Sequence, residues 1–108
     1  MSHSLNQLVG QLIIAGFRGT QANYNSDIAR YIHDFNLGGI ILYDEDIEIG
    51  GRGTRNISSQ DQIWELTQQL QSYSDDGLIV AIDQEGGSVT RLKLDYGFPK
   101  LHSWYHIG

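Results

Sequence analysis

The chain has 108 residues, enough for one small domain with a single core. Hydrophobic residues make up 40% and charged residues 19%, a balance typical of a folded chain and not of a disordered one. The net charge of −6, with scattered basic residues, argues against a nucleic-acid partner. Because the chain has no cysteine, disulfides and thiolate metal sites are excluded.

The N-terminal stretch "MSHSLNQLVGQLIIAGF" carries no basic leader, and glycines and glutamine interrupt its apolar run. No segment approaches the roughly 18 apolar residues that a membrane span requires. We therefore expect a soluble, cytoplasmic protein with no membrane partner.

The first predicted element is a short helix. Ser4 and Gln7 have the spacing of a capping box, which marks a helix start. Residues 11–17 could continue this helix or form a first strand. Gly16 and Gly19 favour the strand, followed by a turn.

A second helix is predicted after Asn25 or Ser26, either of which can cap it. Gly38 supplies its stop signal. One stripe of this helix is apolar at the spacing of an amphipathic helix, and it consists of Ile28, Ile32 and Phe35.

Two short apolar runs predict buried strands on either side of a third helix. "GGIILY" spans residues 38–43, and "LIVAI" spans residues 78–82. An irregular, glycine-rich loop at 44–56 follows the first strand. Ser58 or Ser59 then caps a helix whose apolar face holds Ile63, Leu66 and Leu70. This alternation of helices and buried strands predicts a parallel α/β sheet.

Acidic residues follow both predicted strands, at the edge where such folds collect binding groups. The first strand runs into Asp44 and Asp46, and the second into Asp83 and Glu85. If the second strand persists through Glu85, its two acids share a face. Arg91 can fold back toward Asp83.

Gly86 and Gly87 follow these acids and predict either a sharp turn or the close approach of a ligand. The alternative is purely structural, with Asp83 capping a turn and Arg91 pairing with it. Residues 88–94, "SVTRLKL", alternate like a strand before Gly97, Phe98 and Pro99 end the pattern.

The stretch "AIDQEGGSVTRL" resembles the signature of the glycoside hydrolase family 3 N-terminal domain, whose β-N-acetylhexosaminidase branch typically shows "VDQEGGRVQRL". "LVGQLIIAGFRGT" resembles the family's "VGQLLMVGFRG". "LGGIILYDEDIEIGG…RNISS…QIWELTQQLQ" resembles "GGVILFDRD…RNIESPEQLRALTAALQ", and "GFPKLHS" resembles "GFPPLPS". These blocks cover nearly the whole chain in the same order.

The resemblance implies an incomplete (β/α)8 TIM-type barrel, of which residues 1–108 would supply the first two to three parallel βα units. It implies that Asp83 and Arg91 bind the non-reducing sugar. Their chemistry suits the role, because a carboxylate accepts hydrogen bonds from hydroxyls and a guanidinium donates them in a fixed fork. Glu85 would be a supporting acceptor, while Gly86 and Gly87 would clear space for the sugar.

The family also departs from this chain in places. Ser88 replaces a usual arginine, and Gln60 and His102 replace usual prolines. These changes are expected to weaken local charge pairing and to loosen turns.

By the same resemblance, the chain would be part of a retaining β-N-acetylhexosaminidase acting on terminal N-acetylglucosaminyl linkages, for instance in cell-wall recycling. The family's nucleophile, a downstream aspartate, and its acid/base histidine on a "KHFPGHG"-like loop have no counterpart here. The chain's four histidines match no such position; His33 is expected at the surface of its helix, and the others are His3, His102 and His106. No catalytic residue, metal or cofactor is therefore assigned.

Two other readings stay open. The chain could be a non-catalytic sugar-binding or interaction fragment. More weakly, Asp44, Asp46 and Asp83 could form a divalent-metal pocket, since such ions prefer carboxylate oxygens. An open set of βα units would also expose a strand edge, so we expect marginal stability or self-association.

Overall fold

The computed structural model describes residues 4–100, 102 and 103. Within these described residues, three helices alternate with three short strands, and a single 3-10 turn follows the last strand. In chain order the elements are α1 (Leu5–Gly10), β1 (Ile14–Ala15), α2 (Asp27–Phe35), β2 (Gly39–Leu42), α3 (Gln60–Ser72), β3 (Ile79–Ile82) and η1 (Leu94–Tyr96).

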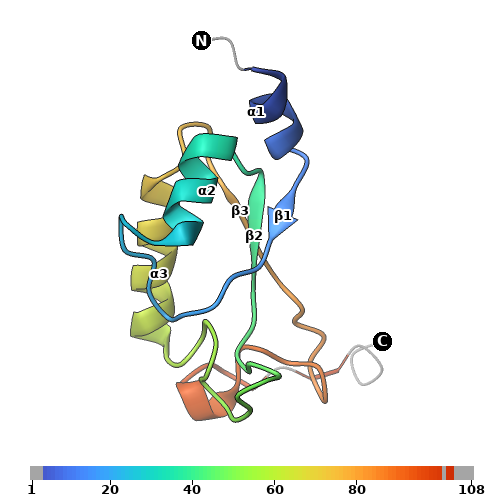
Figure 1. Cartoon of the computed structure of the whole chain (residues 1–108). Coiled ribbons are helices and arrows are strands. Elements are labelled where there is room, and N and C mark those ends of the chain that lie inside the picture. Colours follow the sequence, from blue (N-terminus) through green and yellow to red (C-terminus); the bar gives the residue numbers. More distant parts are fainter. Residues whose placement is uncertain (1–3, 101, 104–108) are drawn as a thin grey trace.

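The three strands form one parallel sheet in the order β1-β2-β3. Ile14, Gly39 and Ile79 lie side by side in its register. Figure 1 shows α2 and α3 on the same side of this sheet. The predicted parallel α/β arrangement is therefore confirmed, and residues 11–17 contain the predicted strand.

The core lies between the sheet and these two helices. Ile40 and Leu42 of β2 are almost fully buried against it, which fits a central strand with neighbours on both edges. The predicted helix stripes supply the rest, namely Ile28, Ile32, Leu66 and Leu70, with Ile63 partly buried beside them. Full burial of each such side chain stabilises the fold by roughly 1.5–3 kcal/mol.

Phe35 departs from its stripe, because it is the last residue of α2 and its side chain is 49% exposed. Its ring lies 5.9 Å from that of Tyr31. The exposed end of the helix thus carries a ring pair in place of a core contact.

The helix starts agree with the predicted caps. Ser4 and Gln7 form the capping box, and Ser26 and Ser59 accept from the first-turn N–H groups of α2 and α3. The structure thereby chooses these two serines over Asn25 and Ser58.

The stop signal of α2 was assigned to the wrong residue. Asn36, in the left-handed conformation with φ 54°, ends the helix two residues before Gly38. Its side chain donates to Asp76 Oδ2 at 3.1 Å, which helps to hold the turn. Gly38 is required for another reason, because a Cβ there would collide with the backbone of Gln11.

The other face of the sheet is not covered by a helix in the described part of the chain (Figure 1). Ile14 and Ile79 flank Gly39 on this face and are 52% and 63% exposed. The prediction that residues 78–82 form a buried strand is therefore only partly right, because β3 is an edge strand with one open face. Nor is any helix of the described residues long and apolar enough to cross a bilayer.

Candidate functional site

Polar side chains gather where β2 and β3 end. The loop after β2 and the turn η1 lie together at this end of the sheet (Figure 1). The carboxyl ends of parallel strands point the same way, so residues far apart in sequence meet here.

Asp83 and Arg91 lie next to each other, as the sequence predicted. Asp83 Oδ2 is 3.9 Å from Arg91 Nη2. The carboxylate is 51% exposed, whereas the guanidinium side chain is only 25% exposed. The Arg91 guanidinium also lies over the ring of Tyr43, 5.4 Å from its centroid, and Arg55 lies 5.2 Å from the same centroid.

Gln84 brings Arg91 back to Asp83. Its Oε1 accepts from the backbone N–H groups of Arg91 and Leu92, both at 2.9 Å, and its Nε2 donates to Thr90 Oγ1 at 2.6 Å. This role was missed in the sequence, because a glutamine between two acids gives no signal that it bonds a segment seven residues later.

β3 ends at Ile82, so Asp83 and Glu85 do not share a strand face as was conditionally predicted. The chain turns instead. Glu85 N donates to Val89 O at 2.9 Å, and Gly86 bridges Val89 in antiparallel fashion. The side chain of Glu85 is exposed.

Gly86 and Gly87 both have left-handed φ values, 80° and 60°, so of the two predicted uses the sharp turn is observed. A Cβ on Gly86 would strike the carbonyl of His102, and one on Gly87 would lie 3.1 Å from Ser103 Cβ. The backbone of His102 therefore fills the space beside Gly86, whereas the Ser103 side chain lies beside Gly87, and the use of these glycines by a sugar stays a prediction.

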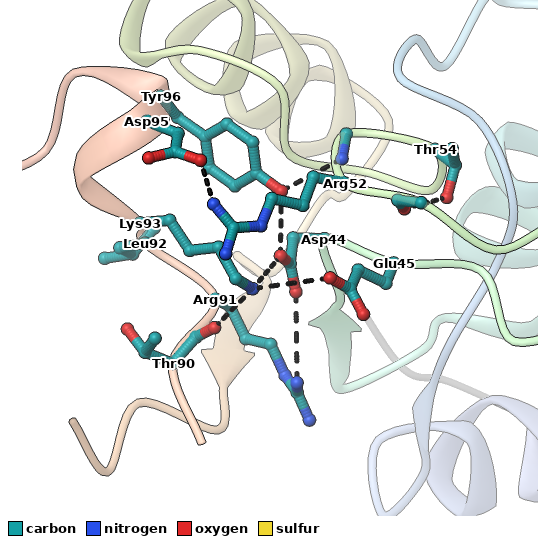
Figure 2. A network of polar contacts seen from close by, with 12 residues as sticks. Asp44, Glu45, Arg52, Thr54, Thr90, Arg91, Leu92, Lys93, Asp95 and Tyr96 are labelled. Atoms are coloured by element: carbon teal, nitrogen blue, oxygen red, sulfur yellow. Dashed lines mark hydrogen bonds and ion pairs between the residues drawn. The ribbon is translucent and has the colours of Figure 1, made fainter. Parts of the chain in front are cut away.

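Asp44 is the centre of the polar network at this end (Figure 2). It is fully buried, and its Oδ2 accepts from Lys93 Nζ and from the Tyr96 hydroxyl, the latter at 2.8 Å. Lys93 Nζ also donates to Thr90 O at 2.8 Å. Asp44 Oδ1 has no hydrogen bond, and Arg91 Nη1 lies 3.9 Å from it.

Tyr96 stays protonated and donating across the ordinary pH range. Burial raises its pKa to about 12, and the hydrogen bond to Asp44 and that group's negative charge act in the same direction. The Tyr96 oxygen in turn accepts from Gly53 N at 2.9 Å, which ties η1 to the loop after β2.

Asp46 organises that loop. Its Oδ1 accepts from the N–H groups of Glu48 and Ile49 at 3.0 and 3.3 Å, and its Oδ2 pairs with Arg18 Nε at 2.8 Å. Burial by itself would raise the pKa of Asp46. The two N–H donors and the charges of Arg18 and Arg55 outweigh it, so the pKa lies below its usual value.

The divalent-metal reading is not supported by this geometry. Asp44 is engaged by Lys93 and Asp46 by Arg18, so each carboxylate already faces a cation. Within residues 4–100, 102 and 103, no three His, Asp or Glu side chains are grouped to hold a metal ion.

Asn56 anchors the base of the site and was not singled out from the sequence. Its side chain is fully buried, and Oδ1 accepts from Tyr43 N at 3.0 Å. Nδ2 donates to Phe17 O and Gly19 O at 3.2 and 2.9 Å. One amide therefore fixes the end of β2 against the segment that leaves β1.

Of the histidines, the structure describes His33 and His102, and neither forms an ion pair with Asp83. His33 is 69% exposed on α2, as predicted, and pairs with its neighbour Asp34. His102 lines a hollow of about 640 Å³ with Arg52, Lys93 and Lys100, and neither Asp83 nor Arg91 lines it. His3 and His106 lie outside the described residues.

Comparison with known proteins gives a consistent result. No family model matches the chain. A β-hexosaminidase of Nitrosospira multiformis is 34% identical over 84 residues, covering 78% of this chain and 21% of that protein. The chain spans about a fifth of the length of the curated relatives it matches.

Solved structures agree. A glycoside hydrolase family 3 β-N-acetylglucosaminidase from a Paenibacillus species superposes with a TM-score of 0.68 at 38% identity, over 85% of this chain and 16% of that one. NagZ from Neisseria gonorrhoeae, solved with N-trifluoroacetyl-D-glucosamine, gives 0.61 at 29% identity, over 83% and 22%. The chain therefore belongs to glycoside hydrolase family 3, as a sequence of β-hexosaminidase type that matches one part of those longer proteins.

Proposed function

We propose that this chain carries part of the sugar-binding subsite of a retaining β-N-acetylhexosaminidase. Asp83 and Arg91 bind the hydroxyl groups of a terminal N-acetylglucosaminyl residue. The observation that carries the proposal is the meeting of these two side chains at the carboxyl ends of the strands, 3.9 Å apart.

The spacing supports a binding role better than a structural one. A separation of 3.9 Å is too long for a hydrogen bond, so donors and acceptors remain for a ligand. An ion pair with a half-exposed carboxylate adds little stability in water. The two side chains can therefore still form hydrogen bonds with a sugar, and their ion pair contributes little to the stability of the fold.

The relatives support the same ligand class. NagZ from Neisseria gonorrhoeae is solved with N-trifluoroacetyl-D-glucosamine, a derivative of the amino sugar proposed here. This chain is 29% identical to that protein over the matched part.

We further propose that the three strands are part of a (β/α)8-type barrel, with residues 1–108 as its N-terminal portion. In such barrels one sheet face packs against helices and the other lines the interior. Here α2 and α3 cover one face, while the apolar side chains of Ile14 and Ile79 stand exposed on the other. Further strands would bury them.

Hydrolysis is assigned to groups that these 108 residues do not supply, since no "KHFPGHG"-like stretch occurs in the sequence. The same fact favours the second candidate, a non-catalytic sugar-binding or interaction fragment. A sugar-binding fragment would also bind through Asp83 and Arg91, whereas an interaction fragment need not bind a sugar, and neither candidate predicts turnover by these 108 residues alone.

The test combines binding and turnover. N-acetylglucosamine is titrated into the 15N-labelled chain, and a chromogenic N-acetylglucosaminide is offered as substrate. We expect binding without hydrolysis, with Asp83→Ala weakening binding roughly tenfold or more, the worth of a hydrogen bond to a charged group. Asp75→Ala, at the opposite end of the sheet, is the matched control. Absence of binding by the unaltered chain would refute the proposal.

A further inference from the structure

We infer that Asp44 is a positioning residue for Arg91. Held by Lys93 and Tyr96, its carboxylate keeps the guanidinium extended over Tyr43 and toward Asp83. The inference rests on the proposed function in one respect only, namely that Arg91 is positioned to bind a sugar. The contacts themselves are those of the ligand-free chain.

The first step is that Asp44 is fixed. It is fully buried directly after β2, and two donors, Lys93 Nζ and the Tyr96 hydroxyl, converge on its Oδ2. Lys93 is itself held by Thr90 O at 2.8 Å, and the Tyr96 oxygen by Gly53 N at 2.9 Å. The carboxylate therefore has little freedom to rotate.

The second step is that Asp44 presents its other oxygen to Arg91. Oδ1 is buried, has no hydrogen bond, and lies 3.9 Å from Arg91 Nη1. Buried carboxylate oxygens are ordinarily hydrogen-bonded, so an unbonded one facing a cation acts through its charge. Figure 2 shows Arg91 reaching toward Asp44 from below the network.

The third step is that Arg91 lies between two carboxylates without bonding to either. Its guanidinium is 3.9 Å from Asp44 Oδ1 and 3.9 Å from Asp83 Oδ2, and its Nε is buried without a partner. The ring of Tyr43, 5.4 Å away, limits its movement on another side. The forked donors are oriented yet unused, which is the state a binding group needs before its ligand arrives.

Lys93 determines how strongly Asp44 attracts Arg91. It neutralises Asp44, so that the buried carboxylate attracts Arg91 without capturing it in a bidentate pair. Weakening the hold on Oδ2 should let Asp44 draw Arg91 inward. Removing the charge of Asp44 should instead release Arg91 into solvent.

These opposite effects can be measured without any sugar. The Arg91 Nε–H signal is assigned in 1H–15N spectra with the help of Arg91→Lys, and its exchange with water is measured. Asp44→Asn should speed the exchange severalfold, because Arg91 becomes mobile. Tyr96→Phe, which removes one donor to Asp44 without changing charge, should slow it. Asp75→Asn is the control and should leave the rate unchanged.

A second measurement gives the consequence for binding. Asp44→Asn should weaken N-acetylglucosamine binding roughly tenfold, the worth of a hydrogen bond to a charged group, although Asp44 itself stays buried. If Asp44→Asn does not fold, Tyr96→Phe decides, and an unchanged Arg91 exchange rate in it overturns the inference. A lower melting temperature with unchanged Arg91 exchange would also overturn it, since that is a purely structural role. If the exchange rates shift as expected but the unaltered chain binds no N-acetylglucosamine, the positioning role stands and the proposed function fails.

Discussion

Both the oxygen and the nitrogen of the Asn56 side-chain amide form hydrogen bonds inside the protein. It joins Tyr43 N to the carbonyl groups of Phe17 and Gly19, and no water reaches it. A buried polar group left without its partner costs roughly 1–3 kcal/mol, so a side chain that satisfies three such groups is expensive to remove.

Asn56→Ala is therefore expected to lower the free energy of unfolding by about 2–4 kcal/mol, the range of large single-site effects. Urea denaturation followed by circular dichroism measures it. Asn25→Ala, at an exposed position before α2, provides the comparison and should stay within about 0.5 kcal/mol. Equal losses in the two variants would mean that the bonds of Asn56 contribute little.

Asp46 is expected to make the free energy of unfolding depend on pH in the acid range. Its pKa in the folded chain lies below the ordinary value, so the folded state binds the proton less readily than the unfolded state does. The stabilisation is complete above the unfolded value of about 3.9 and is lost as the pH falls through the lower folded pKa.

We accordingly expect the melting temperature of the unaltered chain to fall more steeply below about pH 4 than that of Asp46→Asn. Near pH 7 the variant should be the less stable of the two. Asp75→Asn should keep the unaltered pH profile. Parallel acid profiles for the chain and for Asp46→Asn would show that the loop contacts of Asp46 do not carry this dependence.

At the scale of elements, α3 offers a sharp comparison between adjacent serines. Ser59 Oγ accepts from Gln62 N at 3.1 Å at the start of the helix, whereas Ser58 takes part through its backbone N–H, which donates to Gln62 Oε1.

Ser59→Ala should cost about 1 kcal/mol of stability, the usual worth of an N-cap, while Ser58→Ala should cost almost nothing. Thermal melts of the two variants decide between the residues. A larger loss for Ser58→Ala would contradict the cap seen in the structure.

Periodic elements were predictable from the sequence, and irregular ones were not. The strands at 39–42 and 79–82 and the apolar faces of α2 and α3 follow from local spacing alone. Residues 88–94 alternate like a strand but form none up to Leu94, where η1 begins, because the side chain of Gln84 takes the N–H groups of Arg91 and Leu92. Such a bond between distant residues leaves no periodic trace.

The candidate site divides in the same way. The nearness of Asp83 and Arg91 could be predicted, since the glycines between them allow the chain to reverse. Asp44 was noted as an acid at a strand end and as one member of a possible metal pocket, not as a partner of Arg91. Its partners Lys93 and Tyr96 lie about fifty residues away, and only the sheet order brings them to it.

At the scale of the whole molecule, one sheet face remains open. The radius of gyration is 15.1 Å, against about 13 Å for a compact domain of this length. The exposed apolar side chains at the amino ends of the strands and on α1 include Leu5, Leu8, Leu12, Ile14 and Ile79. Exposed apolar side chains in this number favour association.

We expect the isolated chain to self-associate, with a sedimentation-average mass that rises with concentration. Ile79→Lys should raise the dissociation constant by about an order of magnitude, since burial of one such side chain is worth roughly 1.5–3 kcal/mol. Leu94→Lys, equally exposed on η1 at the other end of the sheet, should leave association unchanged. A chain that stays monomeric at millimolar concentration and melts sharply at high temperature would contradict this expectation.

The contact between Gly86 and the backbone of His102 has a consequence for the tail of the chain. In this contact the backbone of residue 102 packs against the tight turn at residues 86–89, which lies between Asp83 and Arg91. A version shortened after Lys100 would lose this brace, and a protease should then cleave within 86–89 faster than in the full chain. If Asp83 and Arg91 bind a sugar as proposed, the shortened version should bind it more weakly, although neither of these residues is altered.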